Sequence, residues 1–168
     1  MGILEILIKY WPAAIAVAMV VALLLLVRLY SGRGKLPYAV RERLVTKAEL
    51  RFYRALQKAV LDDFEIFAMV RIADVLMVPS QTNQRRKWLN KILAKHVDFI
   101  LCDPGSLAPR LAIELDDASH DRPDRQKRDE FVDHAFESAG LPLLRVRVSA
   151  SYDPRSIRDL INAKLGVG

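Results

Sequence analysis

The chain has 168 residues, 52% of them hydrophobic, and a formal net charge of +6. This length allows one ordinary domain of about 100 to 150 residues together with a short appendage. A single cysteine, Cys102, excludes an intrachain disulfide and a multi-cysteine zinc site. Its place in an apolar run favours a packed side chain over a nucleophile. The excess of basic over acidic residues favours a partner that carries phosphate, either nucleic acid or an anionic membrane surface.

Residues 1–30 are predicted to form a transmembrane anchor. Residues 11–27 contain no charged side chain, and with their flanks they approach the roughly 20 residues that cross a bilayer as a helix. A secretory signal peptide is the competing interpretation, but no small-residue cleavage site follows the apolar run. Positive charge gathers after the run and not before it, which predicts a single pass with the remainder of the chain in the cytoplasm.

Residues 31–43 hold glycines, a proline and several basic side chains, so we expect a basic linker there and a domain over residues 44–168. Thr46 and Glu49 fit a capping box at the start of a first helix. Apolar residues follow at helical spacing, namely Leu50, Tyr53, Leu56 and Val60. Residues 65–78 are rich in Ile, Val, Phe and Met, and they are predicted to form one strand or a bent pair.

A basic amphipathic helix is predicted within residues 79–95, around Trp88. Its basic side chains are Arg85, Arg86, Lys87, Lys91 and Lys95. Two interpretations stay open. The residues form either a solvated helix face or a surface that contacts the phosphates of nucleic acid, because dense like charge destabilises a helix that has no anion beside it.

The rest of the domain is predicted to contain a hairpin, a helix, a strand and a final helix. The hairpin strands cover residues 97–102 and 111–116, and turn residues lie between them. A helix over residues 123–139 precedes a strand over residues 143–148. Asp153 and Pro154 then begin the last helix.

Two acidic residues are predicted to face each other across the hairpin. The connecting loop is centred near Ser106, and a symmetric antiparallel register about that centre places Asp98 opposite Glu114. Opposed like charges destabilise a strand pair, and unpaired charge is costly in apolar strands. A hard divalent cation such as Mg²⁺ is one group that would lie between them. The alternative is that the positive charge comes from the protein itself, through a salt bridge to Arg145 or to an arginine of residues 125–128.

Two further residues could add to this pair. Asp116 shares the strand face of Glu114, and His120 follows after a short turn. They would supply another ligand and a proton-transfer group. A surface histidine is the alternative for His120, and His134 is expected to be a surface histidine.

These residues together resemble a bacterial family of uncharacterised domains in the PD-(D/E)XK nuclease superfamily, and they are more distantly similar to the very short patch repair endonucleases. The resemblance covers residues 44–165. The segments that carry it are residues 95–103 (KHVDFILCD), residues 113–117 (IELDD), His120, residues 125–129 (RQKRD), residues 140–142 (GLP) and residues 144–146 (LRV).

The resemblance implies a restriction-endonuclease-like α/β core, which is a mixed central sheet flanked by helices. In it Asp98 and Glu114 would bind Mg²⁺ or Mn²⁺. The implied activity is hydrolysis of phosphodiester bonds in DNA or RNA. With the anchor predicted above, a bacterial protein of this kind would act at the cytoplasmic face of the inner membrane. The superfamily pattern places a lysine two residues after the glutamate, where this chain has Asp116. That departure resembles the Glu-x-Asp variant of the repair-type relatives, in which a histidine, here His120, shares the proton transfer.

Four more residues receive roles from the resemblance. Lys127 or Arg128 would replace the missing lysine, and Arg145 would orient an acid or a phosphate unless it forms only a salt bridge. Glu49 corresponds to an acid that superfamily members often carry near the metal, although its capping role already accounts for it. Asp116 equally fits a domain that binds nucleic acid without cutting it. A membrane-tethered scaffold, whose basic residues face anionic lipid, is the third functional hypothesis.

Overall fold

The structure, a computed structural model, describes residues 2–31, 36–116 and 123–167. The chain divides into two units, Met1–Arg41 and Glu42–Gly168. The first unit holds helix α1 (Ile3–Ser31), within which Lys9–Ser31 has a mean hydropathy of 2.5. This helix is long and apolar enough to span a membrane, by length and composition only. A signal sequence near the N-terminus passes the same test.

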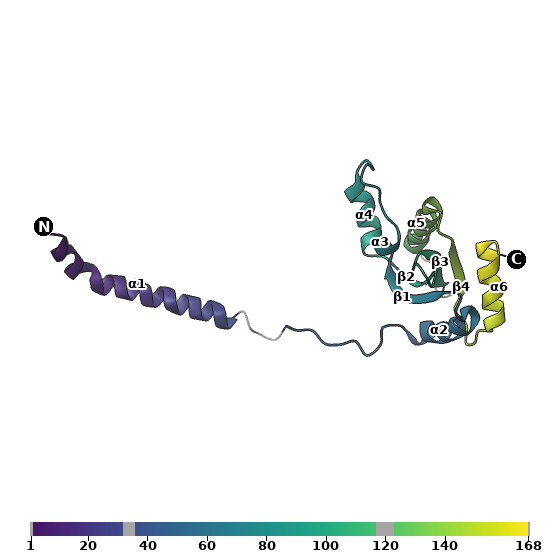
Figure 1. The fold of residues 1–168 in the computed structure, drawn as a ribbon, viewed down its shortest axis with the longest axis horizontal. Helices are drawn as coiled ribbons and strands as arrows, with labels where there is room; N and C mark the ends of the chain where they lie inside the picture. Colours follow the sequence, from purple (N-terminus) through teal and green to yellow (C-terminus); the bar gives the residue numbers. More distant parts are fainter. Residues whose placement is uncertain (1, 32–35, 117–122, 168) are drawn as a thin grey trace. The chain divides into compact units, whose positions relative to one another are not determined.

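The second unit is a mixed α/β domain whose sheet is flanked by helices (Figure 1). Its elements are α2 (Lys47–Val60), β1 (Glu65–Arg71), α3 (Ile72–Val75), α4 (Arg85–Leu93), β2 (His96–Cys102), β3 (Pro109–Asp116), α5 (Pro123–Ala139), β4 (Leu143–Arg147) and α6 (Pro154–Leu165). The strands form one sheet in the order β1-β2-β3-β4. β1, β2 and β3 pair antiparallel, whereas β4 pairs parallel to β3 after the crossover through α5.

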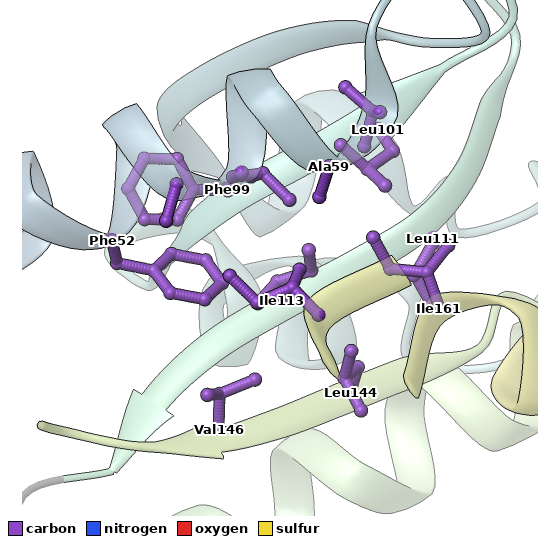
Figure 2. Packing of buried hydrophobic residues seen from close by; sticks show 13 residues of the cluster. Phe52, Ala59, Phe99, Leu101, Leu111, Ile113, Leu144, Val146 and Ile161 are labelled. Carbon is purple, nitrogen blue, oxygen red and sulfur yellow. The ribbon is translucent and has the colours of Figure 1, made fainter. Parts of the chain in front are cut away.

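One face of the sheet is covered by α2 and α6. Phe52 of α2 packs against Phe99 of β2 with ring centroids 5.6 Å apart, and Ile113 of β3 and Ile161 of α6 join the same cluster (Figure 2). All four side chains are fully buried. Burial of a large apolar side chain contributes about 1.5 to 3 kcal/mol, so this layer holds α2 and α6 firmly on the sheet.

The opposite face is covered by α3, α4 and α5. Ile72, Ile92 and Phe136 come one from each helix and pack with Ile100 and Cys102 of β2. Cys102 is 5% exposed, and burial raises the pKa of its thiol. The side chain is therefore packed in the core, as predicted.

Local hydrogen bonds explain where two helices begin. Thr46 Oγ1 accepts from the Glu49 N–H at 3.2 Å, and a Glu49 carboxylate oxygen accepts from the Thr46 N–H at 2.8 Å, which completes the predicted capping box. Asp153 caps α6 by accepting from the Ser156 N–H at 3.1 Å, with Pro154 in the first turn.

The loop between β2 and β3 is held by one acidic side chain. Asp103 Oδ1 accepts from the N–H of Gly105 at 3.1 Å and from the N–H of Ser106 at 2.8 Å. The Ser106 hydroxyl donates to the same oxygen at 2.7 Å, and this bond together with the backbone bonds lowers the pKa of Asp103 and forms the turn that the residues of the loop predict. Beside this loop Cys102 pairs with Pro109, and after a register shift Leu101 pairs with Leu111.

The structure corrects two predicted boundaries. The strand predicted over residues 65–78 ends at Arg71, and one helical turn, α3, follows it. Ile72 and Leu76 are both buried one turn apart, and Arg71 pairs with Asp74 at 2.8 Å, so local burial and an ion pair favour the turn. The helix predicted from residue 79 begins only at Arg85.

Met69 has an unusual backbone conformation in β1. Its φ is 55°, a left-handed value that costs a residue with a side chain about 1 to 2 kcal/mol. The pairs on either side are Ala68 with Phe99 and Val70 with Val97, so Met69 stands opposite Asp98 in the register. The regular pairing of β1 is therefore interrupted beside the candidate site.

Candidate active site

Asp98 of β2 and Glu114 of β3 occupy opposite positions on neighbouring antiparallel strands. Phe99 pairs with Ile113, and the next position in that register joins Asp98 to Glu114. This is the arrangement predicted from a hairpin centred near Ser106. The sheet itself therefore brings the two carboxylates together.

The carboxylate of Asp98 is held by the backbone of the neighbouring strand. Asp98 Oδ2 accepts a hydrogen bond from the Leu115 N–H at 2.7 Å. Burial raises the pKa of Asp98, the bond from Leu115 opposes that rise, and the charges of Glu49 and Asp116 raise the pKa further. Glu49 therefore lies near enough to Asp98 to act on its charge while it also caps α2.

Glu114 is the more strongly perturbed acid. Its side chain is 17% exposed. Burial raises the pKa of Glu114 to about 7, although Arg145 lowers it and Asp98, Asp116 and Asp129 raise it. At neutral pH this carboxyl is therefore divided between its charged and protonated forms.

Arg145 of β4 is bound by three carboxylates. Its Nη1 lies 2.9 Å from Glu114 Oε2 and 3.0 Å from Asp116 Oδ1, and its Nε lies 3.0 Å from Asp133 Oδ1. Burial lowers the pKa of Arg145, but Glu114 and then Asp133 and Asp116 raise it, and the net shift is upward. The predicted salt bridge between Arg145 and Glu114 is therefore present.

One donor of Arg145 is left over. Its Nη2 is buried and has no hydrogen-bond partner among residues 2–31, 36–116 and 123–167. A buried donor without an acceptor is unfavourable. This N–H group is available to an acceptor that the protein itself does not supply.

The donor set fits a magnesium site of limited size. Mg²⁺ is commonly held by one or two carboxylates and keeps several waters or substrate oxygens. Asp98 and Glu114 supply two carboxylates, and burial makes their charged forms unfavourable in the absence of a cation. Over the described part of the chain no group of three or more His, Cys, Asp or Glu side chains could hold a metal ion. The described residues therefore fit a Mg²⁺ site in which two carboxylates bind the ion and water and substrate oxygens complete its coordination.

Several predicted residues cannot be placed. His120 lies outside the described residues, as do the side chains of Lys127 and Arg128. His134 is exposed on α5, as expected of a surface histidine.

Sequence reasoning missed Asp133, the third partner of Arg145. The signal that could have found it is spacing. Asp129 and Asp133 are one helical turn apart on α5, so they share a side of that helix. Asp129 raises the pKa of Glu114, and Asp133 pairs with Arg145.

The predicted basic residues lie in two different environments, and Lys95 follows the end of α4 at Leu93. Lys91 Nζ stands 4.6 Å from the ring centroid of Trp88 and 5.1 Å from that of Phe131, and Lys95 Nζ stands 5.9 Å from Phe131. Such cation–π contacts tie these two lysines to α4 and α5.

The remaining basic residues of α4 lie at the surface. Arg85 donates from Nε to the Val78 carbonyl at 3.1 Å, and Arg86 and Lys87 are exposed. Arg85 and Lys91 are exposed as well, so the predicted phosphate-contacting surface is accessible at all four of these residues.

Comparison with known proteins adds a family. A family model described as "Protein of unknown function (DUF2726)" matches residues 41–165. No curated protein and no solved structure matches the chain. The matched range includes every site residue described above and leaves out α1.

Proposed function

The chain belongs to the family Protein of unknown function (DUF2726), and we propose that its α/β domain is a metal-dependent nuclease that hydrolyses phosphodiester bonds of DNA or RNA. The observation that carries this proposal is the placement of Asp98 and Glu114 on opposed strands. Burial raises the pKa of both acids, and the pKa of Glu114 reaches about 7. Buried carboxylates of this kind are stabilised by a divalent cation.

The fold supports the same proposal. A four-stranded mixed sheet flanked by helices fits the restriction-endonuclease-like core implied by the resemblance to PD-(D/E)XK nucleases. Asp98 and Glu114 occupy the positions of the metal-binding acids in that resemblance. The proposed assignment to this superfamily therefore rests on the matching segments and on where the sheet places them.

The protein's own side chains would have separate tasks. Asp98 and Glu114 would hold Mg²⁺ or Mn²⁺, which when bound polarises a phosphodiester and lowers the pKa of a coordinated water. The Leu115 N–H orients Asp98, and Arg145 orients Glu114 and Asp116. His120 would transfer a proton, and Arg128 or Lys127 would supply the positive charge missing at Asp116.

Cleavage by the full chain tests the proposal. The protein, reconstituted in nanodiscs, is given labelled single-stranded DNA, duplex DNA and RNA with Mg²⁺ or Mn²⁺. We expect cleavage of at least one substrate, and a loss of more than about 100-fold in Asp98→Asn and in Glu114→Gln, since loss of even an outer-shell partner costs a metal site 10- to 100-fold. Asp62→Asn, an exposed aspartate, is the matched control. Full cleavage by both site variants would refute the proposal.

A second candidate is favoured by Asp116. This residue replaces the usual lysine and pairs with Arg145 at 3.0 Å, which fits a domain that binds nucleic acid without cutting it. Such a module would bind oligonucleotides in EDTA with strong salt dependence and would cleave none with either metal.

We also propose that α1 anchors the domain at the cytoplasmic face of the bacterial inner membrane. Lys9–Ser31 has the required length and hydropathy, and basic residues are concentrated after it. Trypsin added to intact spheroplasts should leave the domain uncut, whereas trypsin added to lysed spheroplasts should digest it. Digestion in intact spheroplasts would reverse the proposed orientation.

A further inference from the structure

The side of the domain formed by α2 and α6 carries an unassigned basic groove. Two adjoining hollows share Lys58 and Pro154 in their walls. One hollow is also lined by Arg51, Arg54 and Ser151. The other is also lined by residues at the start of α6, among them Arg155, Arg158 and Asp159. We call the two hollows together the α2–α6 groove.

Three basic residues of α2 face this groove without a counterion. Arg51, Arg54 and Lys58 are spaced by three and four residues, so they share one side of the helix. All three are exposed, and within the described ranges none of their charged groups makes an ion pair or a side-chain hydrogen bond. Like charges at this spacing destabilise a helix, and a bound anion removes that repulsion.

The far wall of the groove is less strongly charged. Arg158 is paired with Asp63, and Asp159 contributes one acid. Hydrogen bonds from Ser156 lower the pKa of the α6 cap Asp153, and the neighbouring Arg155 lowers it further. The unpaired positive charge is therefore concentrated along α2.

The groove begins near the candidate active site. Ser151 and Tyr152, which line the groove, follow β4 closely in the sequence, and the last residue of β4, Arg147, pairs with Asp116 at the end of β3. From Arg51 to Lys58 the helix advances about 10 Å, which corresponds to about three nucleotide steps along a strand.

We propose that the α2–α6 groove binds the phosphate backbone of a nucleic-acid strand and leads it toward the end of the sheet at which β3 and β4 carry the candidate site. The inference rests on the proposed function and deepens it by assigning the strand-binding surface. A concave, basic wall that also includes the exposed Ser151 suits a sugar-phosphate chain. A flat bilayer surface would instead favour a helix with a broad apolar face.

Oligonucleotide binding tests this assignment without depending on cleavage. The full chain in nanodiscs of neutral phosphatidylcholine is titrated with labelled single-stranded DNA in EDTA, at several salt concentrations. The variant Arg51→Gln/Arg54→Gln/Lys58→Gln keeps good helix formers at all three positions. We expect its affinity at 0.1 M salt to fall at least about tenfold, and the slope of log affinity against log salt to decrease by about 2.

A second triple variant controls for net charge. Arg41→Gln/Arg110→Gln/Lys164→Gln removes three exposed charges outside the groove, and we expect its salt slope to change by less than about 1. Equal losses in both triple variants would overturn the assignment, because net charge would then explain the binding.

The remaining outcomes separate the groove from the proposed function. Binding by the wild-type chain that the α2 variant retains in full would overturn the groove alone. If that variant instead loses only its co-sedimentation with phosphatidylglycerol vesicles, the groove contacts lipid and the assignment also fails. No binding by the wild-type chain to single-stranded DNA would overturn the groove, whereas the nuclease is judged separately by cleavage with Mg²⁺ or Mn²⁺.

Discussion

Replacement of Glu114 by glutamine should stabilise the domain in a manner that depends on pH. Burial raises the pKa of Glu114 from its ordinary 4.5 to about 7, so the folded state binds a proton more tightly than the unfolded state does. Below about pH 4.5 the carboxyl is protonated in both states, and its charge then has no effect on stability. As the pH rises from 4.5 to 7 the folded state loses stability, by about 3 kcal/mol in total.

The variant Glu114→Gln keeps a neutral side chain of the same shape at every pH. We therefore expect its advantage over the wild type to be small at pH 4.5 and to approach about 3 kcal/mol at pH 8, a value that already includes the attraction of Arg145, because Arg145 is one of the causes that set the pKa of Glu114. Urea unfolding of the full chain in detergent with EDTA, followed by circular dichroism at pH 4.5, 6 and 8, measures the difference.

Glu137→Gln is the matched control, because Glu137 is exposed on α5, and its effect should stay within about 0.5 kcal/mol at each pH. Mg²⁺ at pH 8 should stabilise the wild type and leave Glu114→Gln unchanged, since only the charged carboxylate gains from the cation. An advantage of Glu114→Gln that is the same at pH 4.5 and pH 8 would refute the attribution to a buried charge.

Three further perturbations address neighbouring residues. Arg145→Met should destabilise the domain by about 2 kcal/mol in urea unfolding, because it leaves Glu114 and Asp116 without a counterion; unchanged stability would contradict that role. Glu49→Ala should lower the free energy of unfolding by about 1 kcal/mol, because it removes the capping box. Glu49→Gln should keep the capping box and the stability. Equal losses of stability in the two variants would show that the charge of Glu49, and not its capping bond, stabilises the domain. Cys102, buried in the core, should react with iodoacetamide only after unfolding, and rapid labelling of the native chain would place it at the surface.

The placement of Asp98 opposite Glu114 could be predicted because it depends on residues that are close together in the sequence. A loop centred near Ser106 and strict alternation along two strands determine which residues face each other. The helix starts at Thr46 and Asp153 were predictable for the same reason, since a cap is formed by neighbours in the sequence.

The partners of Arg145 could not be ranked from the sequence. Its bonds to Glu114 and Asp116 depend on the parallel pairing of β3 with β4, and its bond to Asp133 depends on how α5 lies over the sheet. Both are tertiary arrangements that strand periodicity does not determine. The early end of β1 has a similar origin, because burial of Ile72 and Leu76 outweighs the β-forming composition of that segment.

The left-handed backbone of Met69 bears on how the molecule avoids self-association. β1 lies at one edge of the sheet, and an edge strand offers a row of unpaired backbone groups on which a second molecule can build another strand. With a φ of 55° at its centre, β1 cannot present that row as one flat, continuous template. The conformation that interrupts pairing opposite Asp98 therefore also protects the domain against edge-to-edge aggregation.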